Sequence, residues 1–300
     1  MRAAEPPAAG NAPGAPAPST ARPLDRSTAR AVRVFVLSGN GTNCEVETAH
    51  AWKLAGADAA DIVPIWEWAA GRASLDGHEV LALPGGFMDG DDLGSARACA
   101  HRMRCTRPRP GGPTMLEEIV AFVRRGGLVL GICNGFQLLV KVGLLPGGAD
   151  DPRPTTTLGP NVRGRFEDRW VRLLPDATSP CVFTKGLSEF ELPVRHGEGR
   201  LLFADDAARQ AAVDRHLVPL RYSLSGLPTD RYPFNPNGSE ENAAALCDAT
   251  GRIFGLMPHP EAFVTRTQHP RWTRESRDAL PEEGAGLRLF RNAVEAVRGA

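Results

Sequence analysis

The stretch "GGLVLGICNGFQLLVKVGLLP", residues 126–146, decides the fold of this chain. Two glycines precede a short apolar run that ends at Cys133, and apolar residues then recur at helical spacing. This pattern predicts a buried strand, a sharp turn and a helix. Gly131 and Gly135 flank the turn, which makes it the cysteine counterpart of the GxSxG nucleophile elbow.

The same alternation runs through the first half of the chain. Strand-like runs at 32–37, 60–66 and 78–86 alternate with helical patterns, of which "TMLEEIVAFVRRGG" is the clearest. Such alternation indicates βαβ units and a mostly parallel sheet flanked by helices. The second half reads as shorter strands between turns. We therefore predict an α/β fold with additional antiparallel strands in the second half, joined to the same sheet.

Composition limits the classes of partner and compartment. The chain has 35 basic and 35 acidic side chains, which gives no electrostatic reason to expect nucleic acid or an anionic membrane as a partner. No apolar stretch approaches the roughly 18–20 residues of a membrane helix. The six cysteines lack CxxC or zinc-finger spacing, so we expect neither a metal site nor a disulfide scaffold, and a cytoplasmic location.

The chain divides into a tail and one domain. Residues 1–30 contain nine Ala and six Pro and are predicted to be a disordered tail, with an organellar transit peptide as the alternative. Residues 31–300 are predicted to form the folded domain. Within it, "HRMRCTRPRPGGP" (101–113) is basic and rich in Pro and Gly, and it is predicted to be a surface loop.

Cys133 is the first candidate for chemistry. On an elbow, its side chain would lie at the first turn of the following helix, where unpaired N–H groups stabilise a thiolate and the N–H of Asn134 can hold an oxyanion. The competing interpretation is an inert buried cysteine, because free cysteines are often buried. The flanking glycines leave these two interpretations evenly balanced.

A nucleophilic thiol needs a base, and His259 in "GLMPHPEAF" is the best placed of the seven histidines. It follows a buried strand, and Glu261 two residues later can accept from one imidazole nitrogen while the other faces the thiol. Alone, this histidine would more often be a surface residue. With both loops expected at the same sheet edge, the catalytic interpretation is favoured.

The third element is the turn Pro84-Gly85-Gly86, which ends another predicted strand. Its backbone N–H groups are unobstructed by side chains, so it can form an oxyanion hole or contact a ligand. Considered alone, it would be an ordinary strand-to-helix turn.

Together these motifs resemble the triad class of glutamine amidotransferases, in the order PGGF, GICNGFQ and MPHPE. Further stretches resemble the glutaminase components of phosphoribosylformylglycinamidine synthase: "GTNCEVETAHAWKLAGA", "GGFMDGDDL", "RHGEGR", "YPFNPNGSEENAAALCDATGRIFGLMPHPE" and "HPRWTR". The resemblance covers roughly residues 32–298. It implies a class I amidotransferase-like, flavodoxin-like fold over 31–300.

The resemblance also implies roles for individual residues. Cys133 would attack the side-chain amide of glutamine, with His259 as base and then acid and Glu261 orienting it. The N–H groups of Gly86 and Asn134 would form the oxyanion hole. The implied substrate-binding positions are Gly85, Gln137, His196 and Gly197.

Partners and cofactors follow from the same resemblance. Ammonia would pass to an ATP-dependent synthetase subunit, with a small accessory subunit also expected, and the product would be formylglycinamidine ribonucleotide of purine biosynthesis. The chain has no GxxxxGK[ST] loop, so ATP and Mg²⁺ are expected on the synthetase and no cofactor or metal on this chain.

Two departures and several alternatives accompany this interpretation. The 101–113 segment lengthens the loop after PGGF, and Ala262-Phe263 replace an expected Arg after HPE. Alternatives are another triad amidotransferase, a free-standing γ-glutamyl hydrolase, and a non-catalytic assembly module, which would be expected to lack a triad member. Cys44 is the rival nucleophile, predicted instead to start a helix and pack near the first strand.

Overall fold

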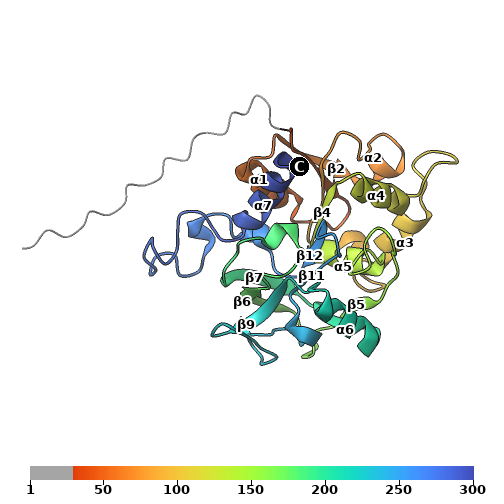
Figure 1. Ribbon diagram of the computed structural model, residues 1–300. Coiled ribbons are helices and arrows are strands. Elements are labelled where there is room, and N and C mark those ends of the chain that lie inside the picture. The colour runs from red at the N-terminus through yellow and green to blue at the C-terminus, as the bar shows by residue number, and fades with distance from the viewer. Residues whose placement is uncertain (1–29) are drawn as a thin grey trace, which may run out of the picture.

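A six-stranded sheet forms the centre of the computed structural model, which describes residues 30–300 (Figure 1). The predicted tail at 1–30 therefore lies, except for residue 30, outside the described residues. The strand order is β11-β12-β4-β3-β1-β2, and only β11 runs antiparallel to its neighbour. The strands are β1 (Arg33–Ser38), β2 (Ala59–Pro64), β3 (Val80–Leu83), β4 (Leu128–Ile132), β11 (Ala245–Cys247) and β12 (Ile253–Leu256).

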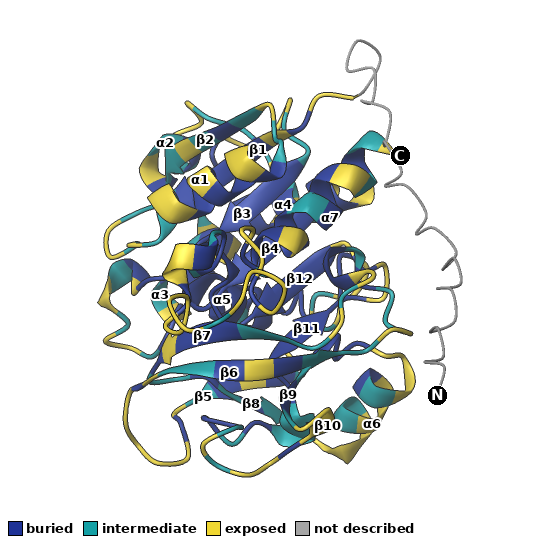
Figure 2. Cartoon of the chain, turned by 90° about the vertical axis from the view of Figure 1, so that its left-hand side faces the viewer, coloured by how far each residue is buried: buried dark blue, intermediate teal, exposed yellow. Residues whose placement is uncertain are grey.

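Helices cover both faces of this sheet, which confirms the predicted α/β class. Strands β3, β4 and β12 are buried along their whole length, as the continuous apolar runs require. Figure 2 shows the strands at the centre as buried and the outward helix faces as exposed. On one side α1 (Glu45–Ala55) packs on α7 (Leu287–Arg298), and on the other lie α3 (Arg97–Cys105), α4 (Met115–Arg124) and α5 (Asn134–Lys141).

The antiparallel strands of the second half are present, but the expectation that they join the central sheet is wrong for all except β11. A four-stranded sheet has the order β10-β9-β6-β7, and β5 pairs with β8. Buried and exposed residues alternate in β6, where Val171 and Leu173 flank exposed Arg172. This alternation is typical of a sheet with one face exposed to solvent and one face packed on the core, and not of a sheet with helices on both faces. The bounds are β5 (Thr156–Gly159), β6 (Glu167–Pro175), β7 (Phe190–His196), β8 (Arg200–Phe203), β9 (Leu220–Leu224) and β10 (Leu227–Pro228).

Two further α-helices are α2 (Ile65–Ala69), which directly follows β2, and α6 (Asp206–Asp214), which follows β8. Asp205 caps α6 by accepting a hydrogen bond from the N–H of Ala208 at 2.7 Å. Across residues 30–300 no helix has both the length and the apolar character needed to cross a membrane.

The predicted surface loop at 101–113 begins later than expected, because residues 101–105 are the C-terminal part of α3. That helix buries Cys99, Ala100 and Met103, an apolar face that the density of charge and proline nearby obscured in the sequence. The remaining segment connects α3 to the capping residue Thr114 of α4.

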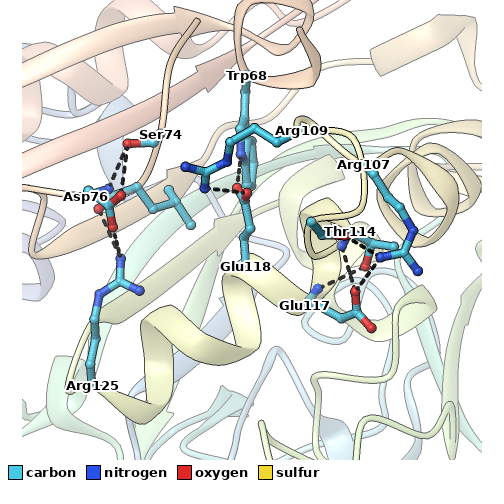
Figure 3. Close-up of polar contacts among 11 residues, drawn as sticks. Trp68, Ser74, Asp76, Arg107, Arg109, Thr114, Glu117, Glu118 and Arg125 are labelled. Carbon is cyan, nitrogen blue, oxygen red and sulfur yellow. Dashed lines mark hydrogen bonds and ion pairs between the residues drawn. The ribbon is translucent and has the colours of Figure 1, made fainter. Parts of the chain in front are cut away.

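This connection is tied to the body of the domain through α4 (Figure 3). Arg107 pairs with Glu117 at 3.5 Å, and Arg109 pairs with Glu118 at 3.4 Å. Glu118 also accepts a 2.6 Å hydrogen bond from the indole of Trp68. The arginines of this segment thus bind within the chain, consistent with a surface loop.

Candidate active site

Cys133 lies at the turn between β4 and α5 with φ 50° and ψ −103°. This backbone conformation is unfavourable for a residue with a Cβ atom and marks a strained position of the kind found at functional sites. The N–H of Cys133 donates to the carbonyl of Leu256 at 2.8 Å, which ties the turn to the end of β12. The predicted strand, sharp turn and helix are all present.

The glycines of the elbow are required by close contacts. A Cβ on Gly135 would lie 1.9 Å from the carbonyl oxygen of Leu83, at the end of β3. A Cβ on Gly131 would lie 2.6 Å from Leu139 and 2.7 Å from the carbonyl oxygen of Gly135. Helix α5 can therefore approach the sheet closely enough to hold the turn only with glycine at both positions.

His259 reaches the same edge of the sheet from the neighbouring strand. Strands β4 and β12 are parallel, and Ile132 pairs with Leu256, so the segments after them leave the sheet side by side. The Nδ1 atom of His259 is 2.6 Å from Oε1 of Glu261, and only 3 % and 2 % of these residues are exposed. The structure thus brings the predicted nucleophile, base and orienting carboxylate together.

The electrostatics of His259 favour its charged form. Burial alone lowers the pKa of His259, but the Glu261 carboxylate, and after it the Cys133 thiol, raise that pKa well above its ordinary value. Among residues 30–300, no atom lies within hydrogen-bonding geometry of Nε2 of His259. The thiols of Cys133 and Cys44 are nevertheless near enough to the imidazole to raise its pKa. A proton taken from a thiol can therefore be held at Nε2.

Gly85 and Gly86 line the opposite side of the nucleophile. A Cβ on Gly85 would lie 2.9 Å from Cε1 of His259 and 3.4 Å from the Cβ of Cys133. Gly86 has φ 143°, and a Cβ there would lie 2.6 Å from the carbonyl oxygen of Gly41. Within the described chain, no acceptor is bonded to the N–H of Gly86 or Asn134, so both can donate to an oxyanion.

The side chain of Asn134 fixes the start of α5. Its Oδ1 accepts from the N–H of Met88 at 3.2 Å, and its Nδ2 donates to Asp91 at 3.1 Å and to Oε1 of Gln137 at 3.0 Å. These bonds join the loop after β3 to the elbow, so the N–H groups that face the site are held by one network.

None of the four predicted substrate positions, Gly85, Gln137, His196 and Gly197, is in the lining of the cavity beside Cys133. Gln137 donates from Nε2 to the carbonyl of Glu198 at 2.6 Å. Nδ1 of His196 is 3.1 Å from Oδ1 of Asn161, and the carbonyl of Gly197 accepts from the N–H of Asn161. Burial lowers the pKa of His196 to about 3, so this imidazole is neutral. These residues hold the 196–199 loop; their contact with substrate remains a prediction.

A cavity of about 260 Å³ opens beside the nucleophile. Its volume lies just below the range of about 300–1,000 Å³ that is typical of pockets for drug-sized ligands. A larger cavity of about 600 Å³ between α4 and α6 has neither a cysteine nor a histidine in its lining, so volume alone does not locate the chemistry. The smaller cavity is lined by Asn43, Cys44, Glu47, Gly86, Phe87, Cys133, Phe166, Arg195, His259, Glu261 and Ala262.

Cys44 is at the start of α1, as predicted, but its thiol lies in this cavity rather than packed near the first strand. Its Sγ is 3.4 Å from the position of a Cβ on Gly85, close to His259. Burial raises the pKa of the Cys44 thiol. The sequence did contain one signal for the position of Cys44. This residue follows β1, and parallel strands end at the same edge of a sheet, where the elbow also lies.

Sequence reasoning missed the two other charged residues of the cavity, Glu47 and Arg195. Both are exposed, and neither takes part in an ion pair among residues 30–300. Glu47 lies on α1 and Arg195 on β7 of the second sheet. The available signal for Arg195 was the motif RHGEGR, which begins at this residue and from which only His196 and Gly197 were assigned to the site.

Ala262 and Phe263, which replace the Arg expected after HPE, have a structural role. Ala262 lines the cavity, and Phe263 packs edge-to-face on Trp170 with 5.1 Å between ring centroids. His269 lies against the same two rings. An apolar residue at 263 thus joins the loop bearing His259 to β6 by aromatic packing.

Comparisons with known proteins identify the family of this chain. A family model described as a CobB/CobQ-like glutamine amidotransferase domain matches residues 31–297. The phosphoribosylformylglycinamidine synthase subunit PurQ of Dehalococcoides mccartyi is 43 % identical over 89 % of this chain and 98 % of its own length. The chain belongs to the PurQ family of glutamine amidotransferases.

Other PurQ-family matches extend over similar lengths. A PurQ subunit of Methanococcus maripaludis is 38 % identical over 88 % of this chain and 96 % of its own length. The fold is similar to a chain in the structure of PurLQS from Thermotoga maritima, with a TM-score of 0.64, 27 % identity, and coverage of 89 % of this chain and 99 % of that one.

Proposed function

We propose that this chain is the glutaminase subunit of phosphoribosylformylglycinamidine synthase and that Cys133, His259 and Glu261 perform the hydrolysis of glutamine. The observation that carries the proposal is a cysteine on a strained elbow beside a buried imidazole–carboxylate pair, in a PurQ-family chain. Neither a metal nor a cofactor is needed on this chain for the steps below.

Hydrolysis proceeds in two halves. The sulfur of Cys133 attacks the side-chain amide carbon of glutamine while Nε2 of His259 takes the thiol proton. The C–N bond breaks, His259 returns its proton to the leaving nitrogen, and ammonia departs from a glutamyl thioester. Water then attacks the thioester, His259 takes a proton from it, and the released thiolate regains that proton as glutamate leaves.

The two tetrahedral intermediates place negative charge on the former amide oxygen. The N–H groups of Gly86 and Asn134 are the free donors on either side of Cys133. Each such donor contributes about 3 kcal/mol of transition-state stabilisation in enzymes of this type. The network around the Asn134 side chain acts by holding these donors in place.

The remaining charged groups of the cavity suit the other end of glutamine. Free glutamine carries an α-carboxylate and an α-ammonium group. Arg195 supplies a cation and Glu47 an anion, and no ion pair within the described chain occupies either. We assign Arg195 to the carboxylate and Glu47 to the ammonium, since a guanidinium matches carboxylate geometry.

Replacing Arg195 by alanine is expected to raise KM for glutamine by about tenfold or more and to leave kcat within about threefold, since it removes binding shared by ground and transition states. Steady-state hydrolysis measures both constants. Arg288→Ala is the matched control, because Arg288 pairs with Glu295 on α7 outside the cavity. A fall in kcat with unchanged KM would contradict the assignment.

Ammonia released in the cavity must reach a partner before it escapes to solvent. Phe87 and Phe166 line the cavity with 47 % and 53 % of their surface exposed, and apolar side chains of this size favour a protein cover. We place the synthetase subunit over this face, with ATP and Mg²⁺ bound there, a small accessory subunit in the assembly, and the complex in the cytoplasm.

Reconstitution tests the proposal. This chain, mixed with the synthetase subunit, should support glutamine-dependent conversion of formylglycinamide ribonucleotide to the amidine, and the synthetase alone should require added ammonia. Glutamine hydrolysis is measured with and without the partner. If the mixture uses ammonia but not glutamine, while this chain remains folded, the proposed function is wrong.

A further inference from the structure

The catalytic pair lies within a group of side chains that also matches a metal-binding geometry. Ligand atoms of Cys44, His259 and Glu261 all lie within 4.8 Å of one another. A tetrahedral Zn²⁺ site with N, O and S ligands needs ligand separations of about 3.4–3.8 Å. Within this group, shifts of about 1 Å would be enough to bring the Cys44 sulfur and the His259 imidazole to the separation of two ligands of one ion.

Cys133 adds a second sulfur to this group. A Cβ atom built on Gly85 would lie 3.4 Å from the Cβ of Cys133 and 3.4 Å from the Sγ of Cys44. The distance between these two cysteine atoms is therefore at most twice 3.4 Å. Both thiols also interact with the His259 imidazole. Two cysteine sulfurs and one histidine nitrogen thus border one small space.

The buried polar atoms are arranged as an inner and an outer shell. Nε2 of His259 lacks a partner at hydrogen-bond distance in the described chain, and the residue is only 3 % exposed. Its Nδ1–H is held by Oε1 of Glu261 at 2.6 Å. A carboxylate on the far nitrogen of a ligating histidine is the usual second-shell arrangement at zinc, because it keeps the remaining proton on Nδ1 when the metal displaces the proton of Nε2.

We propose that this cavity binds one thiophilic divalent cation of the Zn²⁺ type through the sulfurs of Cys44 and Cys133 and Nε2 of His259, with Glu261 as the outer carboxylate. Two cysteines and one histidine form a known three-ligand zinc set with a fourth position open. Binding releases the protons carried by the two sulfurs and Nε2. No sequence spacing indicates the site, because its ligands come from three separate loops.

Occupation of this site would inhibit the enzyme. The ion takes the electron pairs of both the nucleophile and the base, so Cys133 cannot attack an amide and His259 cannot accept a proton. The binding rests on the geometry alone, whereas the inhibition also rests on the proposed glutaminase function. Failure of the metal site would therefore leave the glutaminase assignment intact.

Metal binding is measured on the full chain with a non-thiol reductant present. Titration with Cd²⁺ should produce a sulfur-to-metal charge-transfer absorption that saturates at one ion per chain, and Zn²⁺ should displace it. Cys44→Ser should weaken Zn²⁺ binding by at least about 100-fold. Cys105→Ser is the matched control, since Cys105 is exposed and has its own neighbouring imidazole, with Nε2 of His101 3.7 Å away.

Two further readouts keep the test decisive if a variant folds poorly. On the wild-type chain, Zn²⁺ should slow alkylation of Cys44 and Cys133 but not of Cys105, as followed by peptide mass spectrometry. In the reconstituted complex, Zn²⁺ should inhibit glutamine hydrolysis reversibly, with relief by a chelator and a much weaker effect on Cys44→Ser. Binding lost in Cys105→Ser but retained in Cys44→Ser, or no protection of the cavity cysteines, would overturn the proposal.

Discussion

Glutamine hydrolysis falls by at least about 10,000-fold in kcat when Cys133 is replaced by alanine, because no other group can form the glutamyl thioester. The thiol lies on a strained turn, and the glycines on both sides of that turn allow the close packing that exposes the thiol to the cavity. The melting temperature should change little, since alanine keeps the Cβ atom and removes only the sulfur, which borders the cavity. Steady-state release of glutamate measures the effect.

Cys44→Ala is the informative comparison because Cys44 borders the same cavity and interacts with the same imidazole. Burial raises the pKa of its thiol, which lowers the fraction present as thiolate, and Cys44 is not on an elbow. We expect Cys44→Ala to keep kcat within about tenfold of the wild-type value. Loss of hydrolysis in Cys44→Ala with retention in Cys133→Ala would contradict the assignment.

Replacing Glu261 by glutamine should lower kcat by about 1,000- to 10,000-fold with little change in KM. The carboxylate holds Nδ1–H of His259 at 2.6 Å and stabilises the imidazolium formed when the base takes a proton. Glutamine has the same shape without the charge, and its amide N–H can favour the wrong imidazole tautomer. The variant is compared by full Michaelis–Menten kinetics.

A structural role for Glu261 is separated from this positioning role by two controls. Glu261→Asp should recover part of kcat because it keeps the charge. Glu295→Gln on the exposed face of α7 changes the same residue type away from the cavity and should leave kinetics unaltered. If Glu261→Gln keeps kcat above a tenth of the wild-type value while remaining folded, the carboxylate does not orient the base.

The sequence contained much of what positions the nucleophile. Gly131 and Gly135 are steric requirements of the turn, and their spacing around a cysteine predicted the elbow directly. The apolar runs before Cys133 and His259 predicted buried strands whose following loops lie at the same sheet edge, and β4 and β12 are such strands and pair with each other. Local patterns of this kind persist in the fold because each describes one element and the contact it makes.

The misses have a common physical cause: they depend on how separate elements meet. The second sheet brings Arg195 to the cavity, and only the path of the loop after β1 places Cys44 beside His259. The 196–199 loop likewise meets α5 only in the folded chain, where the amide of Gln137 donates to the carbonyl of Glu198. Sequence periodicity carries no information on such long-range contacts.

The most direct test of the central claim is to find which sulfur carries the glutamyl group. The complex is treated with an electrophilic glutamine analogue that alkylates the attacking nucleophile, and the modified peptide is identified by mass spectrometry. The account predicts one label per chain on Cys133, prevented by excess glutamine. A label on Cys44, with Cys133 unmodified, would contradict it.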